Sequence, residues 1–386
     1  MAWRKVAVAD ERLRFVVAAD DPERCMAELC RRFGISRQTG YKWLRRYRQE
    51  GPGAVLAERS RRPRATPRQA PAELVEAVQA ARRQRPDWGA RKLVEVLRAA
   101  RPELAPAARS TVHRILLRAH LVVAEDRHRP APRRFERARP NELWQMDFKG
   151  PQGFNKGPGP LSILDDHSRY LLALRQLGSL RLNAVRDALE AVLESCGLPE
   201  CLLLDHGTPW FNCFSPWGWT ELSVWILRQG IRIRLSGVRH PQTQGKVERM
   251  HGALQRAVRK RQAPANQQPW LDQFRYEYNH LRPHEALGMQ TPAARWSPSP
   301  RRYQPTPPDW VYPADWLLQT LAGEGQLWWH GRRWEISAAL RRQPVALELL
   351  GDRALVHFCN ITLRELNLRT GQNRVLAANP FRLLPG

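Results

Sequence analysis

Hydrophobic positions in the first 50 residues follow helical spacing, interrupted by one short turn. Met26, Leu29 and Phe33 predict a helix, and Ser36 is placed to cap a second helix over residues 37–49. A helix, a glycine turn and a basic helix indicate a helix-turn-helix, whose second helix enters the major groove of DNA. An ordinary helical hairpin with a solvated charged face is the alternative. The candidate DNA-contacting residues on the second helix are Arg37, Gln38, Thr39, Lys42, Arg45 and Arg46.

Three further apolar stripes, at residues 74–81, 93–97 and 112–117, predict a second helical unit. The basic stretch 88–92 stands at the start of its middle helix. A second helix-turn-helix and a plain helical spacer fit this pattern equally well.

From residue 143 the pattern changes to alternation. Trp144, Met146 and Phe148 share one face of a strand, whereas Gln145 and Asp147 share the other. Apolar runs predict further strands at 161–164, 170–177, 201–205 and 231–235, and helices at 182–196, 222–229 and 244–262. This order of elements predicts an α/β domain with a mixed sheet.

The last part of the chain predicts short strands only. They are expected at 316–321, 326–329, 333–336, 345–349, 354–358 and 361–366, and their spacing favours a small β-barrel. Segments rich in Pro and Arg separate the parts. The predicted division is 1–52 helix-turn-helix, 53–72 basic linker, 73–124 second helical unit, 125–140 Pro/Arg linker, 141–297 α/β core, 298–313 Pro-rich linker and 314–386 β-barrel.

The charge of the chain indicates a polyanionic partner. Lys and Arg number 63 against 37 Asp and Glu, a net charge of +26, and 33 of the 63 basic residues lie in residues 1–140. Arginine predominates, which suits phosphate binding, although a GC-rich genome would also enrich it. The six cysteines have no zinc-finger spacing and are typical of buried thiols in a reducing compartment. The absence of a long apolar run and of a signal peptide predicts a cytoplasmic protein without a membrane span.

Three acids occupy informative places in the α/β region. Asp147 lies on the polar face of the first strand, Asp205 ends an apolar strand, and Glu248 lies near the start of the long helix. Each alone is compatible with a solvated residue or a helix-end charge. Together they favour a shared site, because ligands gather at the carboxyl ends of strands in open α/β sheets. Hard oxygen donors point to Mg²⁺ or Mn²⁺, and two such ions suit phosphoryl transfer.

Five motifs then occur in a fixed order. They are WQMD at 144–147, LDDHSR at 164–169, DHGTP at 205–209, HPQTQGKVER at 240–249, and YNHLRPHEAL at 278–287 followed by Thr291-Pro292. As a set they resemble the integrase catalytic core of bacterial insertion-sequence transposases, the DDE family. The resemblance implies a ribonuclease-H-like fold, with Asp147, Asp205 and Glu248 as the catalytic and metal-binding residues for two ions.

The resemblance also implies the partners. They are the terminal inverted repeats and the target, both double-stranded DNA, in a dimeric or tetrameric homo-oligomer, with an AAA+ ATPase as a possible helper. Cleavage would free a 3′-OH at the element end, and that hydroxyl would then attack target DNA. Around the site, Lys149, His240, Gln244, Lys246 and Arg249 are candidates for phosphate contacts, and Asp166 is a candidate supporting group.

Two positions depart from the family pattern. His206 follows Asp205, where the family usually has Asn, and the separation of Asp205 from Glu248 is longer than usual. The extra residues fall in 209–219, either a DNA-facing loop with stacking aromatics or a hydrophobic plug. A catalytically decayed transposase acting as a DNA-binding regulator and a plain metal nuclease are the rival functions.

Overall fold

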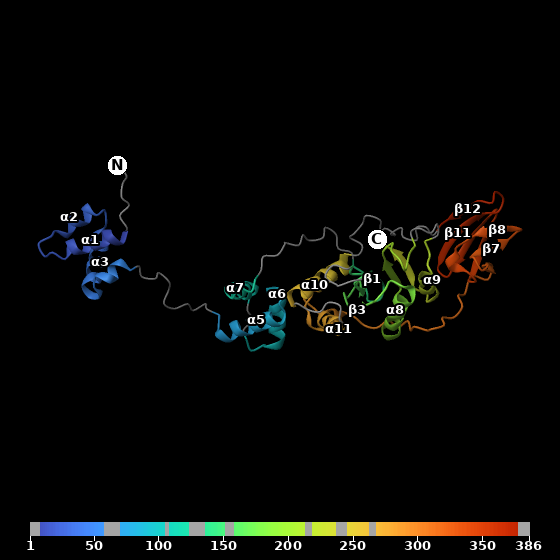
Figure 1. Cartoon of the computed structure of the whole chain (residues 1–386), viewed down its shortest axis with the longest axis horizontal. Helices are drawn as coiled ribbons and strands as arrows, with labels where there is room; N and C mark the ends of the chain where they lie inside the picture. Colours follow the sequence, from blue (N-terminus) through green and yellow to red (C-terminus); the bar gives the residue numbers. More distant parts are fainter. Residues whose placement is uncertain are drawn as a thin grey trace. The chain divides into compact units, whose positions relative to one another are not determined.

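The computed structural model describes residues 8–57, 70–104, 108–122, 136–150, 158–212, 218–236, 245–261 and 268–376. The chain divides into two compact units, Met1–Gln69 and Ala70–Gly386. Figure 1 shows their helices and strands, many of them labelled.

The first unit is helical. Its helices are α1 (Val8–Ala19), α2 (Met26–Arg32), α3 (Arg37–Glu50) and α4 (Pro52–Leu56), so α2 and α3 form the predicted helix-turn-helix. The Ser36 hydroxyl accepts a hydrogen bond from the Thr39 N–H (3.2 Å), which confirms the predicted cap of α3. A Cβ at Gly40 would lie 2.6 Å from Cys30 Sγ, so the missing side chain lets α3 pack against α2.

The second unit begins with three helices around one small core. They are α5 (Ala72–Gln84), α6 (Ala90–Ala100) and α7 (Arg109–Arg118), as the three apolar stripes predict. Val78, Leu93 and Val112 are fully buried at their centre, and Trp88 packs beside them.

A five-stranded mixed sheet follows, in the order β3-β2-β1-β4-β5. Its strands are β1 (Trp144–Phe148), β2 (Pro160–Asp165), β3 (Leu171–Gln176), β4 (Cys201–Leu204) and β5 (Arg232–Leu235). The first three strands form an antiparallel meander, whereas β4 is parallel to both β1 and β5. The mixed sheet and each of its strands are therefore confirmed within a residue or two.

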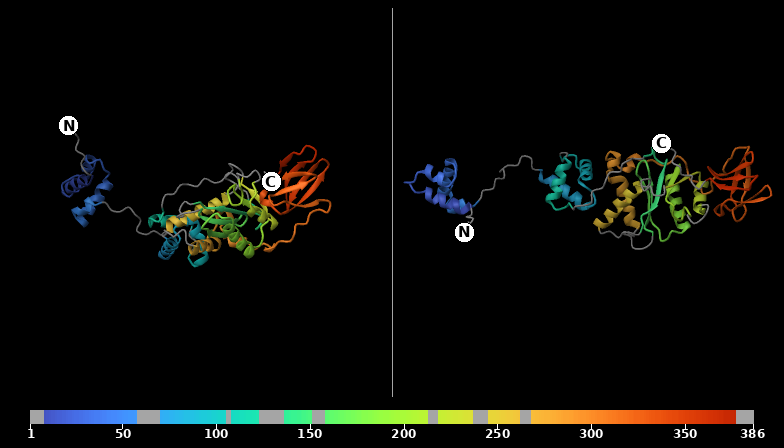
Figure 2. Two further views of the ribbon diagram at one scale, coloured as in Figure 1. Left: turned by 45° about the vertical axis from the view of Figure 1, so that its right-hand side comes forward. Right: turned by 90° about the horizontal axis from the view of Figure 1, so that it is seen from above.

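Helices cover both faces of this sheet (Figure 2). Trp144 and Met146 pack with Leu189 on the face of α8 (Leu182–Cys196) and α9 (Glu221–Arg228). Leu164 packs with Leu254 on the opposite face, under α10 (Gly245–Arg261) and α11 (Gln268–Tyr276). The polar face of β1 therefore lies under α10.

Short helical turns follow α11: the π-helical turn η2 (Glu277–Leu281) and the 3-10 turns η3 (Glu285–Leu287) and η4 (Pro292–Arg295). Asn279 of η2 protects the free edge of β3, because its amide accepts from the Leu171 N–H (2.8 Å) and donates to the Leu171 carbonyl (3.0 Å).

The C-terminal strands do not close into the predicted barrel. An open antiparallel sheet has the order β12-β11-β10-β9-β6, and β7 and β8 form a separate hairpin. The bounds are β6 (Leu317–Thr320), β7 (Gln326–Trp329), β8 (Arg332–Glu335), β9 (Pro344–Leu350), β10 (Arg353–Phe358), β11 (Ile361–Asn367) and β12 (Asn373–Val375). Closure needs paired edges, but in the described part of the chain β6 pairs only with β9, and β12 only with β11. The hairpin instead contributes Leu327 and Trp334 to the apolar core.

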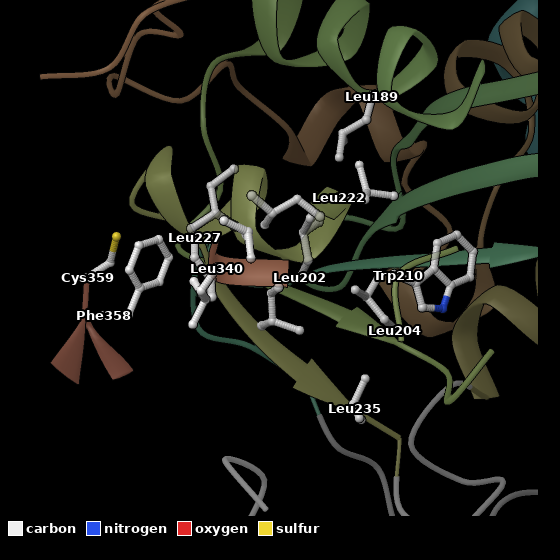
Figure 3. Close-up of a cluster of buried hydrophobic side chains, with 14 of the residues drawn as sticks. Leu189, Leu202, Leu204, Trp210, Leu222, Leu227, Leu235, Leu340, Phe358 and Cys359 are labelled. Carbon is white, nitrogen blue, oxygen red and sulfur yellow. The ribbon is translucent and has the colours of Figure 1, made fainter. Parts of the chain in front are cut away.

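This C-terminal part packs on the α/β core. Leu227 of α9 meets Leu340, in the turn η5 (Ala338–Leu340), and Phe358 of β10 (Figure 3). The Pro-rich segment before it is also anchored, since Ser299 Oγ donates to the Leu198 carbonyl (2.7 Å). No helix among the residues placed by the structure is long and apolar enough to cross a bilayer.

Candidate active site

Asp147 and Asp205 lie beside each other at one edge of the sheet. In the parallel pair, Gln145 of β1 is level with Leu203 of β4. Asp147 stands two residues further along β1, and Asp205 directly follows the last residue of β4, so both acids lie where these neighbouring strands end. Alternation turns both carboxylates toward the face that α10 covers.

Glu248 reaches this edge from the first turn of α10. The N–H of its neighbour Val247 donates to Gln145 Oε1 on β1 (3.3 Å), which ties the start of the helix to the strand. Burial, together with the negative charges of Asp205 and, more weakly, Glu248, raises the pKa of Asp147 to about 7. The three predicted acids therefore form one electrostatic cluster in which negative charge is in excess.

Asp205 is held by two donors on one oxygen. The indole N–H of Trp210 (2.5 Å) and the N–H of Gly207 (2.9 Å) both donate to Oδ1. Trp210 is 2 % exposed and stacks on Phe148, with ring centroids 5.5 Å apart. Trp210 is therefore a buried plug rather than a stacking platform for DNA. Neighbouring His206 lies edge-on to the ring of Phe211.

Asp147 has a buried histidine beside it. His251 Nδ1 lies 3.8 Å from Asp147 Oδ2, and His251 Nε2 lies 2.9 Å from Ser162 Oγ. Burial, with the charge of Lys149, lowers the pKa of His251 to about 3. His251 is thus neutral at neutral pH, and its approach to Asp147 is a polar contact rather than an ion pair. The set resembles a hydrolase triad in residue type, but Ser162 is fully buried and cannot reach a substrate.

The donor chemistry of this edge fits a hard divalent cation. Carboxylate oxygens with excess negative charge are the ligands that Mg²⁺ and Mn²⁺ prefer. Burial lowers the pKa of Lys149, whose positive charge acts on Asp147. Within the described residues, no three His, Cys, Asp or Glu side chains are close enough together to hold one metal ion. The edge therefore offers an acid pair, with Glu248 nearby, rather than a preformed three-ligand site.

The predicted DNA-contacting residues of α3 fall into two groups. Arg37, Gln38, Lys42 and Arg45 are exposed. Thr39 is half-buried, and its hydroxyl lies 2.9 Å from Ser36 Oγ in the helix cap.

Arg46 packs instead against its own unit. Its guanidinium donates to the Ala57 carbonyl (3.0 Å) and lies 5.3 Å from the centre of the Trp43 ring. Arg46 is thus engaged within the fold and is not presented to solvent with the others.

The predicted phosphate-contacting residues near the acids also differ among themselves. Arg249 is exposed in the first turn of α10, and Lys149 is half-buried beside Asp147. Lys246 pairs with the buried Asp166 (2.5 Å). His240 and Gln244 lie outside the described residues.

Comparisons with protein families match both the N-terminal helices and the α/β core. Residues 229–292 match the integrase core domain, residues 11–64 a helix-turn-helix domain, and residues 39–116 a homeodomain-like domain. The chain carries an integrase core behind helix-turn-helix DNA-binding domains. This is the domain set of the DDE transposases that its sequence motifs resemble.

The integrase core is also similar to solved structures of viral integrases. The HTLV-2 integrase catalytic core domain in complex with magnesium is 15 % identical, covering 41 % of this chain and 97 % of that one (TM-score 0.32). The BIV integrase catalytic core domain is 19 % identical, covering 40 % and 92 % (TM-score 0.31). The simian T-cell lymphotropic virus intasome in complex with PP2A regulatory subunit B56 gamma is 17 % identical, covering 68 % and 93 % (TM-score 0.36).

Four residues of the integrase core were not singled out from the sequence as parts of its site. They are Gln145, Ser162, Trp210 and His251. Two carried a readable signal: Gln145 shares the alternating face of Asp147, and His251 lies one helical turn after Glu248. Ser162 carried none, because its contact depends on strand pairing, whereas Trp210 was noted only as an aromatic of the 209–219 segment and not as a partner of Asp205.

Proposed function

We propose that this protein is a metal-dependent transposase that cuts the 3′ ends of an insertion sequence and joins them to target DNA. Asp147, Asp205 and Glu248 are the proposed catalytic residues. The observation that carries the proposal is the net negative acid cluster at the carboxyl ends of β1 and β4, where the charges of Asp205 and Glu248 add to burial in raising the pKa of Asp147. Its setting in an integrase core behind DNA-binding domains supports this chemistry over a plain metal nuclease.

Two Mg²⁺ or Mn²⁺ ions are the proposed cofactors, and Asp147, Asp205 and Glu248 are the residues that would hold them. Bound there, such ions stabilise the negative charge that develops on a phosphodiester under attack. The chain itself orients the ligands. Trp210 and Gly207 occupy one oxygen of Asp205, which leaves its other oxygen to a cation.

DNA recognition is proposed for the exposed face of α3. Arg45→Ala should weaken binding of end DNA by about fivefold to a hundredfold, because an arginine contact to DNA contributes about 1–3 kcal/mol. Arg14→Ala, which removes an exposed arginine of α1, is the matched control and should stay within about twofold. Equal losses in a fluorescence-anisotropy titration would argue against a specific role for α3. Since transposition joins two ends, we also propose a dimer or tetramer on DNA.

The catalytic assignment is tested by Asp147→Asn in the full chain. We expect loss of Mg²⁺-dependent nicking and of strand joining on end DNA, with DNA binding unchanged. Asp187→Asn, an exposed acid on α8, is the control and should keep full activity. Residual strand transfer in Asp147→Asn would refute the assignment. If the unaltered protein binds end DNA but neither cuts nor joins it, the rival function of a DNA-binding regulator is supported.

A further inference from the structure

A fourth acid of the core, Asp166, is fully buried and lies outside the catalytic cluster. Its Oδ2 is 2.5 Å from Lys246 Nζ and accepts a hydrogen bond from the Arg137 N–H (2.9 Å). Its Oδ1 accepts from Gln145 Nε2 (2.8 Å). Every contact comes from a different segment, so Asp166 joins the segment before β1, the strand β1 and the helix α10.

Gln145 extends this network to the helix backbone. While its amide nitrogen donates to Asp166, its amide oxygen accepts from the Val247 N–H (3.3 Å). The first N–H groups of a helix have no partner within the helix, so this bond fixes how α10 begins. Gln145 stands two residues before Asp147, and Val247 immediately precedes Glu248. One buried network thus includes residues next to both Asp147 and Glu248 in the chain.

The exposure of Glu248 makes this support important. Its side chain is exposed, so its place depends on the turn of α10 that carries it. A buried ion pair adds little net stability, because desolvation offsets its attraction, but it holds the paired segments in one geometry. The network is therefore better suited to setting the position of this turn than to stabilising the fold.

We propose that Lys246, Asp166 and Gln145 are positioning residues that hold the first turn of α10 so that Glu248 faces Asp147 and Asp205. This inference rests on the proposed function and replaces the phosphate contact predicted for Lys246. The Lys246 side chain is 14 % exposed. Moving its ammonium to a phosphate would leave Asp166 buried without its cation, which is strongly unfavourable.

The experiment separates ligand positioning from DNA contact. Lys246→Met, Asp166→Asn and Lys246→Arg are made in the full chain, with Asp187→Asn as the control. Mn²⁺ binding is measured by calorimetry without DNA, end-DNA binding by anisotropy without a catalytic metal, and cleavage as a function of Mg²⁺. Lys246→Met and Asp166→Asn should weaken Mn²⁺ binding about tenfold, as loss of a supporting group typically does, and raise the Mg²⁺ requirement in parallel.

DNA affinity should stay within about twofold in these variants, and Lys246→Arg, which keeps the positive charge, should recover most of the Mn²⁺ affinity. If a single variant does not fold, the double variant Lys246→Met/Asp166→Asn removes both charges and serves in its place. Weaker DNA binding with unchanged Mn²⁺ affinity would overturn the inference in favour of a phosphate contact. Unaltered protein that neither binds Mn²⁺ nor cleaves DNA would overturn the proposed function, and this inference with it.

Discussion

The two ends of helix α10 use buried charge in opposite ways. At the C-terminal end, Arg261 donates to Asp87 (2.8 Å) and to Glu277 (2.8 Å), and Arg282 approaches the same Asp87 (3.4 Å). Asp87 lies between α5 and α6, so this network joins the second helical unit to the core. At the N-terminal end, Asp166 is matched by Lys246, but the carboxylates of Asp147 and Asp205 beside this pair gather under excess negative charge.

The difference separates structural charge from functional charge. Each buried cation at the C-terminal end has a carboxylate partner, which is typical of an interface that must stay closed. At the other end, negative charge in excess costs stability and is retained where a cation has to bind. Removing a carboxylate at the C-terminal end should therefore lower the stability of the fold, whereas removing one at the N-terminal acid cluster should raise it.

The largest effect is expected at the C-terminal end. Asp87→Asn leaves two guanidinium groups, those of Arg261 and Arg282, facing each other without their shared anion. Removing one partner of a buried ionic network costs about 3–5 kcal/mol, and we expect about 4 kcal/mol here in urea denaturation. The exposed control Asp187→Asn should change stability by less than about 0.5 kcal/mol. A cost below about 1 kcal/mol for Asp87→Asn would mean that the network does not hold the helical unit on the core.

The stability of the fold should fall in acid because of His251, which lies in the N-terminal half of α10. His251 has a pKa of about 3 in the folded protein against 6.5 for an ordinary histidine, so the fold requires the neutral ring. Stability is then complete above pH 6.5 and is lost as the pH falls toward 3, because the unfolded chain takes up the proton first. At pH 4 the loss is about 3 kcal/mol, at 1.36 kcal/mol per pKa unit.

His251→Gln is the variant that isolates this effect. It should lose stability less steeply than the unaltered protein between pH 6.5 and 4, as measured by urea titration at each pH. An exposed histidine, His330→Gln, serves as the control and should leave the slope unchanged. Parallel profiles for His251→Gln and the unaltered protein would show that the ring is not buried neutral.

The sequence predicted the parts of this comparison unequally. Alternation at Trp144–Phe148 and the rule that strand ends meet at one edge predicted that Asp147 and Asp205 share a site, whereas Glu248 was added from its place near the start of a predicted helix. The Asp87 network was not predictable from the sequence, because the partners of Asp87 lie 174 and 195 residues away. Their contact depends on how the helices α5 and α6 pack on the α/β core. For the same reason, short strands at even spacing did not reveal that the C-terminal sheet stays open.

The acid cluster should give a stabilising substitution. The pKa of Asp147 is raised from 3.8 to about 7 in the folded protein. The folded state therefore holds the Asp147 proton more tightly than the unfolded chain does, and this favours folding fully below pH 3.8. The advantage falls as the pH rises and is lost above about 7. Asp147→Asn removes the repelling charge, and we expect its gain in stability to be about 2.5 kcal/mol larger at pH 8 than at pH 5 and to vanish below about pH 3.8. Thermal unfolding without divalent cations measures it, with Asp187→Asn as the reference. Destabilisation at pH 8 would show that Asp147 is already compensated by its neighbours.

The smallest effect concerns the cation itself. Below pH 7 a proton resides on Asp147 in the metal-free protein, and a cation that binds there must displace it. Apparent Mn²⁺ affinity should therefore fall about tenfold, or 1.4 kcal/mol, for each pH unit below 7 and level off above it. Calorimetry in buffers of different ionisation enthalpy should find about one proton released per binding event at pH 6. An affinity independent of pH from 5.5 to 8 would place the cation away from Asp147, whereas a slope that persists in Asp147→Asn would assign the proton to another group. The C-terminal end of α10, where the anions already have cations, should show neither the slope nor the binding.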